Sequence, residues 1–546
     1  MIHSIGLSGF QQEYNNILIV KKGAKVHRIS IIFLLLICSF SQTLGHPSHI
    51  PVTRLISPDN SIPLSYKEWK ELTSNSLPVS IGNVGITGGD GGKVNVIVNS
   101  SLYPKLTYFL DPSTGQFITD LTNDGWTVSV DTMTASSDPF APETLRNFLI
   151  SEYNTGSVGA ILVGDLPIAW YQMMNTFWGS PPSYTDFPID LFYMDLDGIW
   201  LDQYKESGGN LIPGSDSIYD THLGNMEADI FIGRLTTSTV GDDSTLLYEY
   251  FQRNHSYRVN NFELSKEALF YIDDDWEYWT SEWAGQLGMV YDSILVVNDP
   301  ETTIADDYRT RITISHEWIS VFAHSWPQGH GFKYNGGNLW SWFYSYEIPG
   351  INPIANFYNL FACSNARYTE SDNCGGMYTF RTSYGLGALG SAKTGSMLEF
   401  QYFYSPLSQG KCLGDAFKEW FAIMAEAWGD TSRSWFYGMT LIGDPTLTVI
   451  DSLTAIAEAP EMKKSEIKLY ITPNPASHYV EFQLSDNKKK LVELIIYGVD
   501  GRIVWREKKE CTSLLRWDCG KIPAGIYFSN IITPDKRFSN KLIILK

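Results

Sequence analysis

Residues 159–165 read Gly-Ala-Ile-Leu-Val-Gly-Asp, an apolar run that stops at a glycine and an aspartate. A second apolar run, 126–130, lies upstream. Between the two runs, apolar side chains recur at helical spacing, namely Leu145, Phe148, Leu149 and Tyr153. Pro142 precedes them, and proline is favoured in the first turn of a helix. Strand, helix and strand in this order predict a parallel sheet with helices on its faces.

The same alternation continues downstream. Short apolar runs predict further buried strands at 94–98, 230–232, 268–272, 319–323 and 360–362. A later helix is indicated by an apolar face made of Leu413, Ala416, Phe417, Trp420, Phe421 and Met424. Leu-Ile-Gly-Asp-Pro at 441–445 closes the pattern. We therefore predict an α/β domain over residues 93–451.

The C-terminal residues 467–546 differ in pattern and in charge. Their apolar runs are short and are separated by turn signals, which is typical of a small all-β sandwich. They carry 14 Lys and Arg against 8 Asp and Glu, a net charge of +6. Because the whole chain carries −20, the remaining residues carry −26. Such an acidic surface repels phosphate backbones and excludes nucleic acid as a partner. Residues 452–466, rich in Ala, Glu, Pro and Lys, suit a linker.

The N-terminal residues 1–45 predict an export signal. Four basic residues at 21–28 precede an apolar run, 29–40, which is too short to span a membrane. The first 20 residues do not belong to a normal signal peptide, so the true start is expected downstream. Because no other stretch is apolar enough, we expect no transmembrane segment in the mature chain. Residues 46–92, rich in Pro, Ser and Gly, predict a loosely structured lead-in or a short propeptide-like segment.

Two reactive residues follow predicted strands. Cys363 follows the run 360–362 and His324 follows the run 319–323. Ligand sites of parallel sheets lie beyond the carboxyl ends of the strands, so both side chains are expected in one cleft. An imidazole beside a thiol lowers the pKa of the thiol and can later protonate a leaving amine. On position alone, a buried core cysteine is an equally good interpretation of Cys363.

Other residues could replace His324 as the base or add a carboxylate to this site. His330, in Gly329-His330-Gly331, is an alternative base, although residues 326–329 predict a loop that leaves its position open. Asp273-Asp274-Asp275 follows the strand 268–272 and offers a carboxylate to orient an imidazole. A solvated turn is the alternative interpretation of the three aspartates.

Four aspartates crowd one short segment, namely Asp190, Asp195, Asp197 and Asp202. Oxygen-rich loops of this kind suit a structural calcium ion, although an ordinary Asp-Gly turn explains them equally well. The six cysteines form no CxxC pair, so a zinc site of the usual spacing is not expected. Nucleophilic attack by a thiol that an imidazole activates requires no cofactor.

Several ordered motifs of residues 93–450 together resemble the gingipain family of caspase-like cysteine peptidases. They are the run 159–165, Ala-Asp-Ile-Phe-Ile-Gly-Arg at 228–234, the strand ending in His324, Phe-Ala-Cys at 361–363, and Leu-Ile-Gly-Asp-Pro-Thr-Leu at 441–447. The resemblance implies a caspase-like fold and a Cys-His dyad, with Ala362-Cys363 matching the nucleophile motif. It also implies a carboxylate after the strand that ends at 272, for which Asp275 lies nearest.

The histidine departs from the family motif, in which glycine follows the base. His324 has the strand but is followed by Ser325, whereas His330 has Gly331 but lacks the strand. We favour His324, because the strand end sets its geometry. The resemblance then implies an oxyanion hole made by the backbone N–H groups of Ser325 and Cys363.

The tail resembles the C-terminal sorting domain of type IX secretion. The resemblance rests on Thr-Pro-Asn-Pro-Ala at 472–476, Gly-Val-Asp-Gly-Arg at 498–502, Pro-Ala-Gly-Ile-Tyr at 523–527 and Lys-Leu-Ile-Ile-Leu-Lys at 541–546. It implies an immunoglobulin-like sandwich, the type IX machinery as a partner, and a secreted or outer-membrane-anchored product. Cys511 and Cys519 could pair in this oxidising location, or both could stay free.

These features predict an exported cysteine endopeptidase that acts on protein or peptide substrates. Two alternatives stay open. The chain could be a catalytically silent homologue that keeps the fold for a role at the surface or in the secretion machinery. It could also be a transpeptidase that uses the same dyad and passes the acyl group to an amine.

Overall fold

The computed structural model describes residues 50–73, 78–89, 91–136, 138–177, 179–260, 264–427, 430–449, 469–472, 476–484, 490–498, 502–511, 514–532 and 537–545. The chain divides into two compact units, Met1–Val449 and Ile450–Lys546. The expected signal peptide and linker lie outside the described residues. None of the helices in the described ranges has the length and apolar content that a bilayer crossing requires.

The first unit is built on an eleven-stranded sheet. Its strands, in spatial order, are β1 (Ile81–Ile86), β3 (Thr127–Met133), β2 (Lys93–Asn99), β4 (Ser157–Val163), β11 (Phe231–Leu235), β20 (Met439–Gly443), β19 (Gly387–Ser391), β18 (Phe357–Phe361), β14 (Trp318–Phe322), β12 (Ala268–Ile272) and β13 (Ile294–Val297). Neighbours are parallel except at β1/β3 and β19/β20. The mixed α/β class with a mostly parallel sheet is therefore confirmed.

The antiparallel pair β19/β20 divides the sheet into two blocks of opposite direction. In one block, β19, β18, β14, β12 and β13 all run the same way. The carboxyl ends of β18, β14 and β12 therefore meet at one edge, because Phe361, Phe322 and Ile272 are aligned across the three strands.

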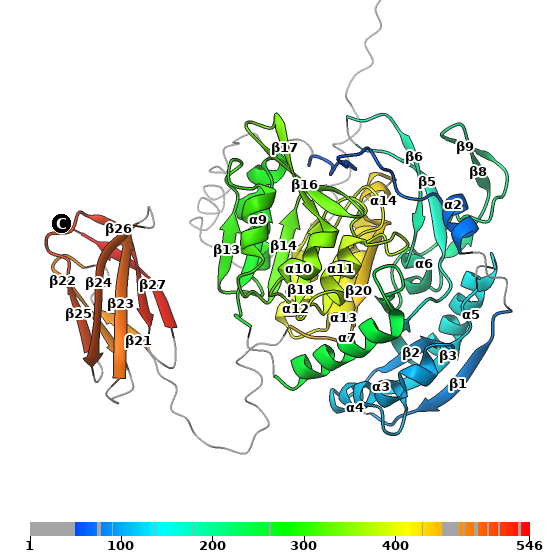
Figure 1. Cartoon of the computed structure of the whole chain (residues 1–546), viewed down its shortest axis with the longest axis horizontal. Coiled ribbons are helices and arrows are strands. Elements are labelled where there is room, and N and C mark those ends of the chain that lie inside the picture. Colours follow the sequence, from blue (N-terminus) through cyan, green and yellow to red (C-terminus); the bar gives the residue numbers. More distant parts are fainter. Residues whose placement is uncertain are drawn as a thin grey trace, which may run out of the picture. The chain divides into compact units, whose positions relative to one another are not determined.

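Helices pack on this sheet (Figure 1). The longer ones are α4 (Gln116–Asn123), α5 (Ala141–Tyr153), α7 (Asp243–Arg258), α8 (Thr280–Leu287), α12 (Gln401–Ser408) and α13 (Leu413–Ala427). In α5, Pro142 stands in the first turn and Leu145 and Leu149 are buried, as the helical spacing predicted. The apolar face expected around residues 413–424 is buried in α13.

Shorter elements extend from this framework. The short helices are α2 (Tyr66–Leu72), α3 (Thr107–Leu110), α6 (Leu191–Met194), α9 (Ala305–Arg311), α10 (Ile348–Ile351), α11 (Cys374–Phe380) and α14 (Asp430–Phe436). The small sheets pair β5 (Trp170–Asn175) with β6 (Ser183–Pro188), β7 (Ile199–Leu201) with β10 (Thr221–Leu223), and β8 (Tyr204–Ser207) with β9 (Asn210–Pro213). A three-stranded sheet joins β15 (His324–Trp326), β16 (Gly329–Tyr334) and β17 (Leu339–Tyr344).

The structure corrects two expectations. The lead-in is not loose throughout, because Ser65 and Glu68 form a capping box that begins helix α2. Residues 326–329 do not leave His330 free, because β15 and β16 form an antiparallel hairpin in which Ser325 pairs with His330. Both features depend on side-chain and strand contacts that the hydrophobic pattern does not reveal.

The C-terminal unit consists of two antiparallel sheets. One is ordered β21 (Leu469–Thr472), β22 (Tyr479–Leu484), β25 (Leu514–Asp518), and the other β24 (Ile503–Cys511), β23 (Lys490–Gly498), β26 (Gly525–Ile532), β27 (Arg537–Ile544). A core of its own includes Phe482, Leu494, Trp517 and Leu542. Strands β21 and β25 were not predicted from the sequence. Cys519 is a buried free thiol, which does not support the pairing with Cys511.

Candidate functional site

Three candidate residues follow three adjacent strands. Cys363 lies two residues after β18, His324 two residues after β14, and Asp275 three residues after β12. Because these parallel strands end level with one another, their following residues share one edge of the sheet. The Oγ of Ser325 donates a hydrogen bond to the carbonyl oxygen of Cys363 at 2.8 Å and ties the first two strand ends together.

His324 is bound through both ring nitrogens. Its Nε2 lies 2.7 Å from Oδ2 of Asp275, and its Nδ1 accepts the backbone N–H of Arg54 at 2.7 Å. These partners fix the tautomer with the proton on Nε2. Burial lowers the pKa of His324, while Asp275 opposes that shift. Burial alone would raise the pKa of Asp275, but hydrogen bonds from His324 and Lys333 hold this pKa well below its usual range.

Residues 50–57 lie over these groups, and we call them the covering segment. The Oγ1 of Thr53 lies 2.8 Å from Sγ of Cys363, while the next residue, Arg54, occupies Nδ1 of His324. The segment also pairs with Ser325 like a parallel strand. The N–H of Ser325 donates to the carbonyl of Arg54 at 3.2 Å, and the N–H of Ile56 donates to the carbonyl of Ser325 at 3.0 Å.

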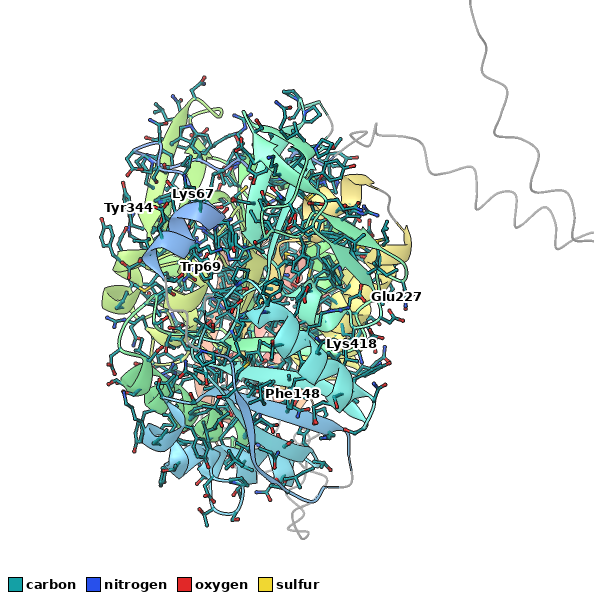
Figure 2. All side chains as sticks on the ribbon, turned by 90° about the vertical axis from the view of Figure 1, so that its right-hand side faces the viewer. Lys67, Trp69, Phe148, Glu227, Tyr344 and Lys418 are labelled. Carbon is teal, nitrogen blue, oxygen red and sulfur yellow. The ribbon has the colours of Figure 1, made fainter. Side chains whose placement is uncertain are left out.

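The chain that follows the covering segment is anchored as well. The N–H of Leu64 donates to Glu370 Oε1 at 2.7 Å, and Arg367 Nη2 donates to the carbonyl of Leu64 at 2.6 Å. In α2 the ring of Trp69 packs against Trp170 at 5.2 Å between centroids, and Lys67 is exposed (Figure 2). Residues 50–72 therefore form a continuous, specifically bound strap over the first unit.

The sulfur of Cys363 is fully enclosed. The residue is 0% exposed, and burial raises the pKa of its thiol. Hydrogen bonds involving Thr53, the N–H of Gly395 and the side chain of Thr394 act in the opposite direction and lower this pKa. The Cys363 sulfur is therefore buried and hydrogen-bonded to three neighbouring residues.

His330 occupies a different environment. It lies on β16 with its ring stacked against both Phe343 and Tyr378, and its Nε2 is 3.2 Å from the Tyr378 hydroxyl. Burial lowers the pKa of His330 to about 3. Its contacts are those of a neutral core residue, whereas His324 shares the covering segment with Cys363.

The four aspartates proposed for calcium do not come together. Asp195 and Asp197 cluster instead with Asp229, with one carboxylate oxygen of each within 4.8 Å of the others. Asp190 forms a buried ion pair with Arg234 at 2.7 Å, and Asp202 accepts hydrogen bonds from residues 215–217. Asp195 is itself engaged by His222 at 2.6 Å and by the N–H of Gly198.

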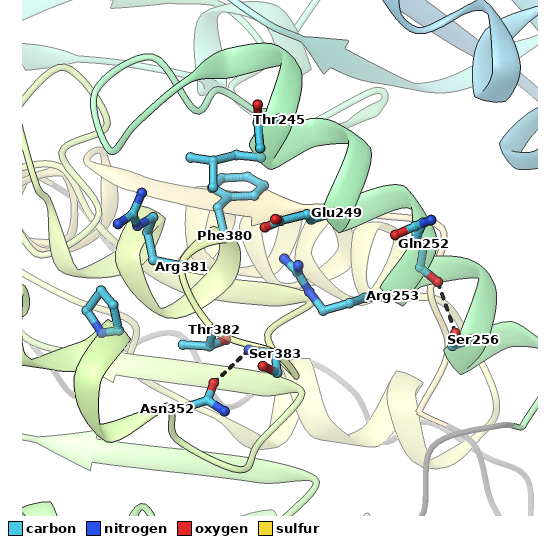
Figure 3. A pocket seen from close by; sticks show the side chains of 12 residues that line it. Thr245, Glu249, Gln252, Arg253, Ser256, Asn352, Phe380, Arg381, Thr382 and Ser383 are labelled. Atoms are coloured by element: carbon cyan, nitrogen blue, oxygen red, sulfur yellow. Dashed lines mark hydrogen bonds between the residues drawn. The ribbon is translucent and has the colours of Figure 1, made fainter.

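A large groove lies elsewhere on the first unit. It has a volume of about 800 Å³ and is lined by α7 together with residues around 349–352 and 380–383 (Figure 3). Arg253 and Glu249 of α7 face it. None of the three candidate site residues lines this groove. The candidate site thus lies under the covering segment and does not open into this groove.

Sequence analysis missed the groups that surround the dyad. Thr53 and Arg54 lie in a lead-in without regular pattern, and Lys333, which donates to Asp275 Oδ2 at 2.5 Å, lies on β16, a strand that was not predicted. No local signal marks them, because each contact joins residues far apart in sequence. Asp229 could have been found, since it lies in the quoted run at 228–234.

Comparisons with known proteins give two family matches. Residues 110–450 match the model of peptidase family C25, the gingipain family, and residues 470–545 match a secretion system C-terminal sorting domain. No curated protein matches the chain.

Solved structures offer only weak likenesses. A protein with an immunoglobulin-like β-sandwich fold from Bacteroides vulgatus is 10% identical, with 14% of this chain and 92% of that one covered at a TM-score of 0.12. An endo-β-1,4-mannanase from Thermotoga petrophila is 8% identical, with 56% and 71% covered at 0.12. These scores are too low to indicate a shared fold.

The C25 model spans more than half of the chain, over the sheet that carries the candidate dyad. The sorting domain indicates export by the type IX system to the cell surface or into the medium. The chain belongs to peptidase family C25, the gingipain family, and ends in a type IX sorting domain.

Proposed function

We propose that the chain is a cysteine endopeptidase of caspase-like fold in which Cys363 is the nucleophile, His324 the acid–base group and Asp275 the residue that orients it. One observation carries the proposal. Cys363 and His324 contact two consecutive residues of a peptide segment, Thr53 and Arg54. A site that already holds an extended peptide between a thiol and an imidazole is arranged for peptide-bond chemistry.

In the proposed reaction, His324 accepts the proton of the Cys363 thiol and the thiolate attacks the carbonyl carbon of the substrate. The negative oxygen is stabilised by the N–H groups of Ser325 and Cys363, and each such donor contributes roughly 10²–10³ to the rate. Protonated Nδ1 of His324 then gives its proton to the leaving amine. Water hydrolyses the resulting thioester with the same imidazole as base.

Because the covering segment occupies the proposed active site, the structure corresponds to a latent form of the enzyme in this proposal. It occupies Nδ1 of His324, the sulfur of Cys363 and the N–H of Ser325, which are the groups that a substrate needs. A substrate can therefore bind only after the segment leaves. We propose that the covering segment, residues 50–57, acts as a propeptide-like cover that is displaced or removed after export.

The alternatives have a specific observation behind them, namely the complete burial of Cys363. If the cover were permanent, the chain would be a silent homologue with a surface or secretion-machinery role. If the acyl group passed to an amine, it would be a transpeptidase. The fold alone does not separate these functions.

The test is to treat the protein, before and after limited proteolysis of the lead-in, with a peptide that carries a thiol-reactive group. If the chain is a peptidase, the reactive peptide forms a covalent adduct with Cys363. An unmodified peptide substrate is then hydrolysed to products with free carboxyl groups. Substrate joined to an added amine would support the transpeptidase. Absence of any adduct on Cys363 after removal of the cover would support the silent homologue.

Calcium is a separate proposal. The peptidase reaction needs no cofactor, and the most compact acidic group among the described residues is Asp195, Asp197 and Asp229. Calcium-dependent thermal stability, lost in Asp229→Asn, would support an ion there. Unchanged stability on chelation would dismiss it.

A further inference from the structure

Lys393 is a buried lysine on the loop that follows β19, the strand beside β18 and Cys363. The residue is 1% exposed. Its Nζ donates hydrogen bonds to the carbonyl oxygens of Thr394 and Ser434, and it lies 5.5 Å from the ring centroids of Phe177 and Phe187. The ammonium group is thus held in one place by two carbonyls and two aromatic faces.

Among the residues that the structure describes, the Lys393 ammonium group forms no ion pair with a carboxylate. The neighbouring cation, Arg367, donates to the carbonyl of Ala392 but faces Asp186 at 3.9 Å and Glu370 at 3.4 Å. The carboxylates in this region are therefore already matched to Arg367. Burying an unmatched charge is costly unless a negative group compensates it.

Once its thiol is deprotonated, Cys363 is the negative group that acts on Lys393. Burial lowers the pKa of Lys393 to about 7, and the charge of the Cys363 thiolate shifts this pKa in the opposite direction. The effect is mutual, because the positive charge of Lys393 lowers the pKa of the Cys363 thiol. The two groups are electrostatically coupled although they belong to different strand ends.

The loop that carries Lys393 is shaped around the sulfur. The next two residues, Thr394 and Gly395, hydrogen-bond to Cys363 through a side chain and a backbone N–H. The carbonyl of Lys393 accepts the N–H of Ser364 at 3.0 Å and fixes the residue after the nucleophile. Gly395 has φ +126°, and an added Cβ would lie 2.3 Å from the carbonyl oxygen of Trp435. At Gly395 the loop therefore packs closely against the backbone of Trp435.

We propose that Lys393 is the electrostatic partner of the nucleophile: its buried ammonium group stabilises the negative charge that Cys363 carries as a thiolate. Lys393 is then a positioning residue that acts through Cys363 and does not touch the substrate. This inference rests on the proposed role of Cys363 as nucleophile. It gives the site a source of thiolate stabilisation that does not depend on protonation of His324, whose pKa is lowered by burial.

A purely structural role would have Lys393 only bind the two carbonyls. Lys393→Gln separates the two roles, because an amide still donates hydrogen bonds but carries no charge. Lys393→Arg is the matched variant that keeps the charge. The ultraviolet absorbance of the thiolate is titrated in the full chain, with Cys363→Ala as the blank. We expect Lys393→Gln to raise the pH midpoint of Cys363 ionisation by at least about one unit, which is a tenfold loss of thiolate below the midpoint. Lys393→Arg should keep most of the thiolate.

A reciprocal measurement keeps the proposal testable if Lys393→Gln does not fold. Because the coupling is mutual, Cys363→Ala should lower the pKa of Lys393, which the pH dependence of its acetylation reports through peptide mapping. An unchanged thiol midpoint in folded Lys393→Gln, or an unchanged acetylation profile in Cys363→Ala, would overturn the proposal. Neither readout requires peptide hydrolysis, so a failure of the peptidase function would be seen separately.

Discussion

Nε2 of His324 lies 2.7 Å from Oδ2 of Asp275, and this contact leaves Nδ1 as the ring nitrogen directed at the peptide of the covering segment. Both residues extend from adjacent strands of a rigid sheet, so the orientation of the imidazole is set by the fold and not by substrate. In the proposed reaction, the pair therefore determines which nitrogen takes up and returns the proton.

Asp275→Asn should lower kcat/KM by at least about tenfold, because the imidazole loses both its orientation and its charge partner. Asp275 raises the pKa of His324 against the effect of burial. Its removal should therefore lower that pKa, and the acid limb of the pH profile of kcat/KM should move to lower pH. Asp274→Asn, at the neighbouring position, is the control. An equal loss in both variants would argue for general damage to the loop.

His324 and His330 should separate cleanly. His324→Ala should lower kcat/KM by at least about a hundredfold, the scale of a lost acid–base group. His330→Phe keeps an aromatic ring packed against Phe343 and Tyr378 and should retain most activity. A large activity loss in His330→Phe with the fold intact would restore His330 as the base.

The same His330 variant has a pH signature in stability. The pKa of His330 is lowered to about 3 in the folded chain, against roughly 6.5 when unfolded. The unfolded state thus binds the proton more readily, so the free energy of unfolding falls as pH drops from about 6.5 towards 3. His330→Phe should remove this part of the acid sensitivity in urea unfolding series. A slope identical to the wild type would contradict the assignment.

Arg54→Pro should open the site. Proline has no N–H, so the hydrogen bond to Nδ1 of His324 is lost and the covering segment is weakened. Arg54→Ala is the matched control, since the side chain of Arg54 is exposed and the N–H stays. We expect iodoacetamide to alkylate Cys363 at least about tenfold faster in the proline variant only. Equal rates in all three proteins would mean that the segment does not limit access.

Much of the site could be predicted because its residues follow strands. Cys363 and His324 come directly after apolar runs and Asp275 comes three residues after one, and parallel strands bring their carboxyl ends to one edge. The covering segment could not be predicted, because Thr53 and Arg54 meet the dyad across about 270 to 310 residues. Asp190 was misread for a related reason. Its partner, Arg234, lies on β11, far along the chain, and nothing local distinguishes a buried ion pair from a metal ligand.

Deletion of residues 467–546 should leave the first unit folded but retained in the periplasm. The C-terminal unit has its own core, so its loss removes no core residue of the first unit. Thermal unfolding of the truncated chain and its location in fractionated cells are the measurements. Phe482→Asp, which places a charge in the core of the tail, should give the same retention. Arrival of the truncated chain at the surface would contradict the sorting role.

The most direct test of the whole account is the cleavage of a denatured protein mixture by the chain after removal of the covering segment, with new N-termini mapped by mass spectrometry. Wild type should produce a consistent set of cleavage sites, and Cys363→Ala should produce none, while Cys374→Ala and Cys412→Ala retain the set. These two cysteines are buried, and burial raises their pKa far above the ordinary thiol range, so they are poor nucleophiles. The same cleavages by Cys363→Ala, or none by the uncovered wild type, would contradict the account.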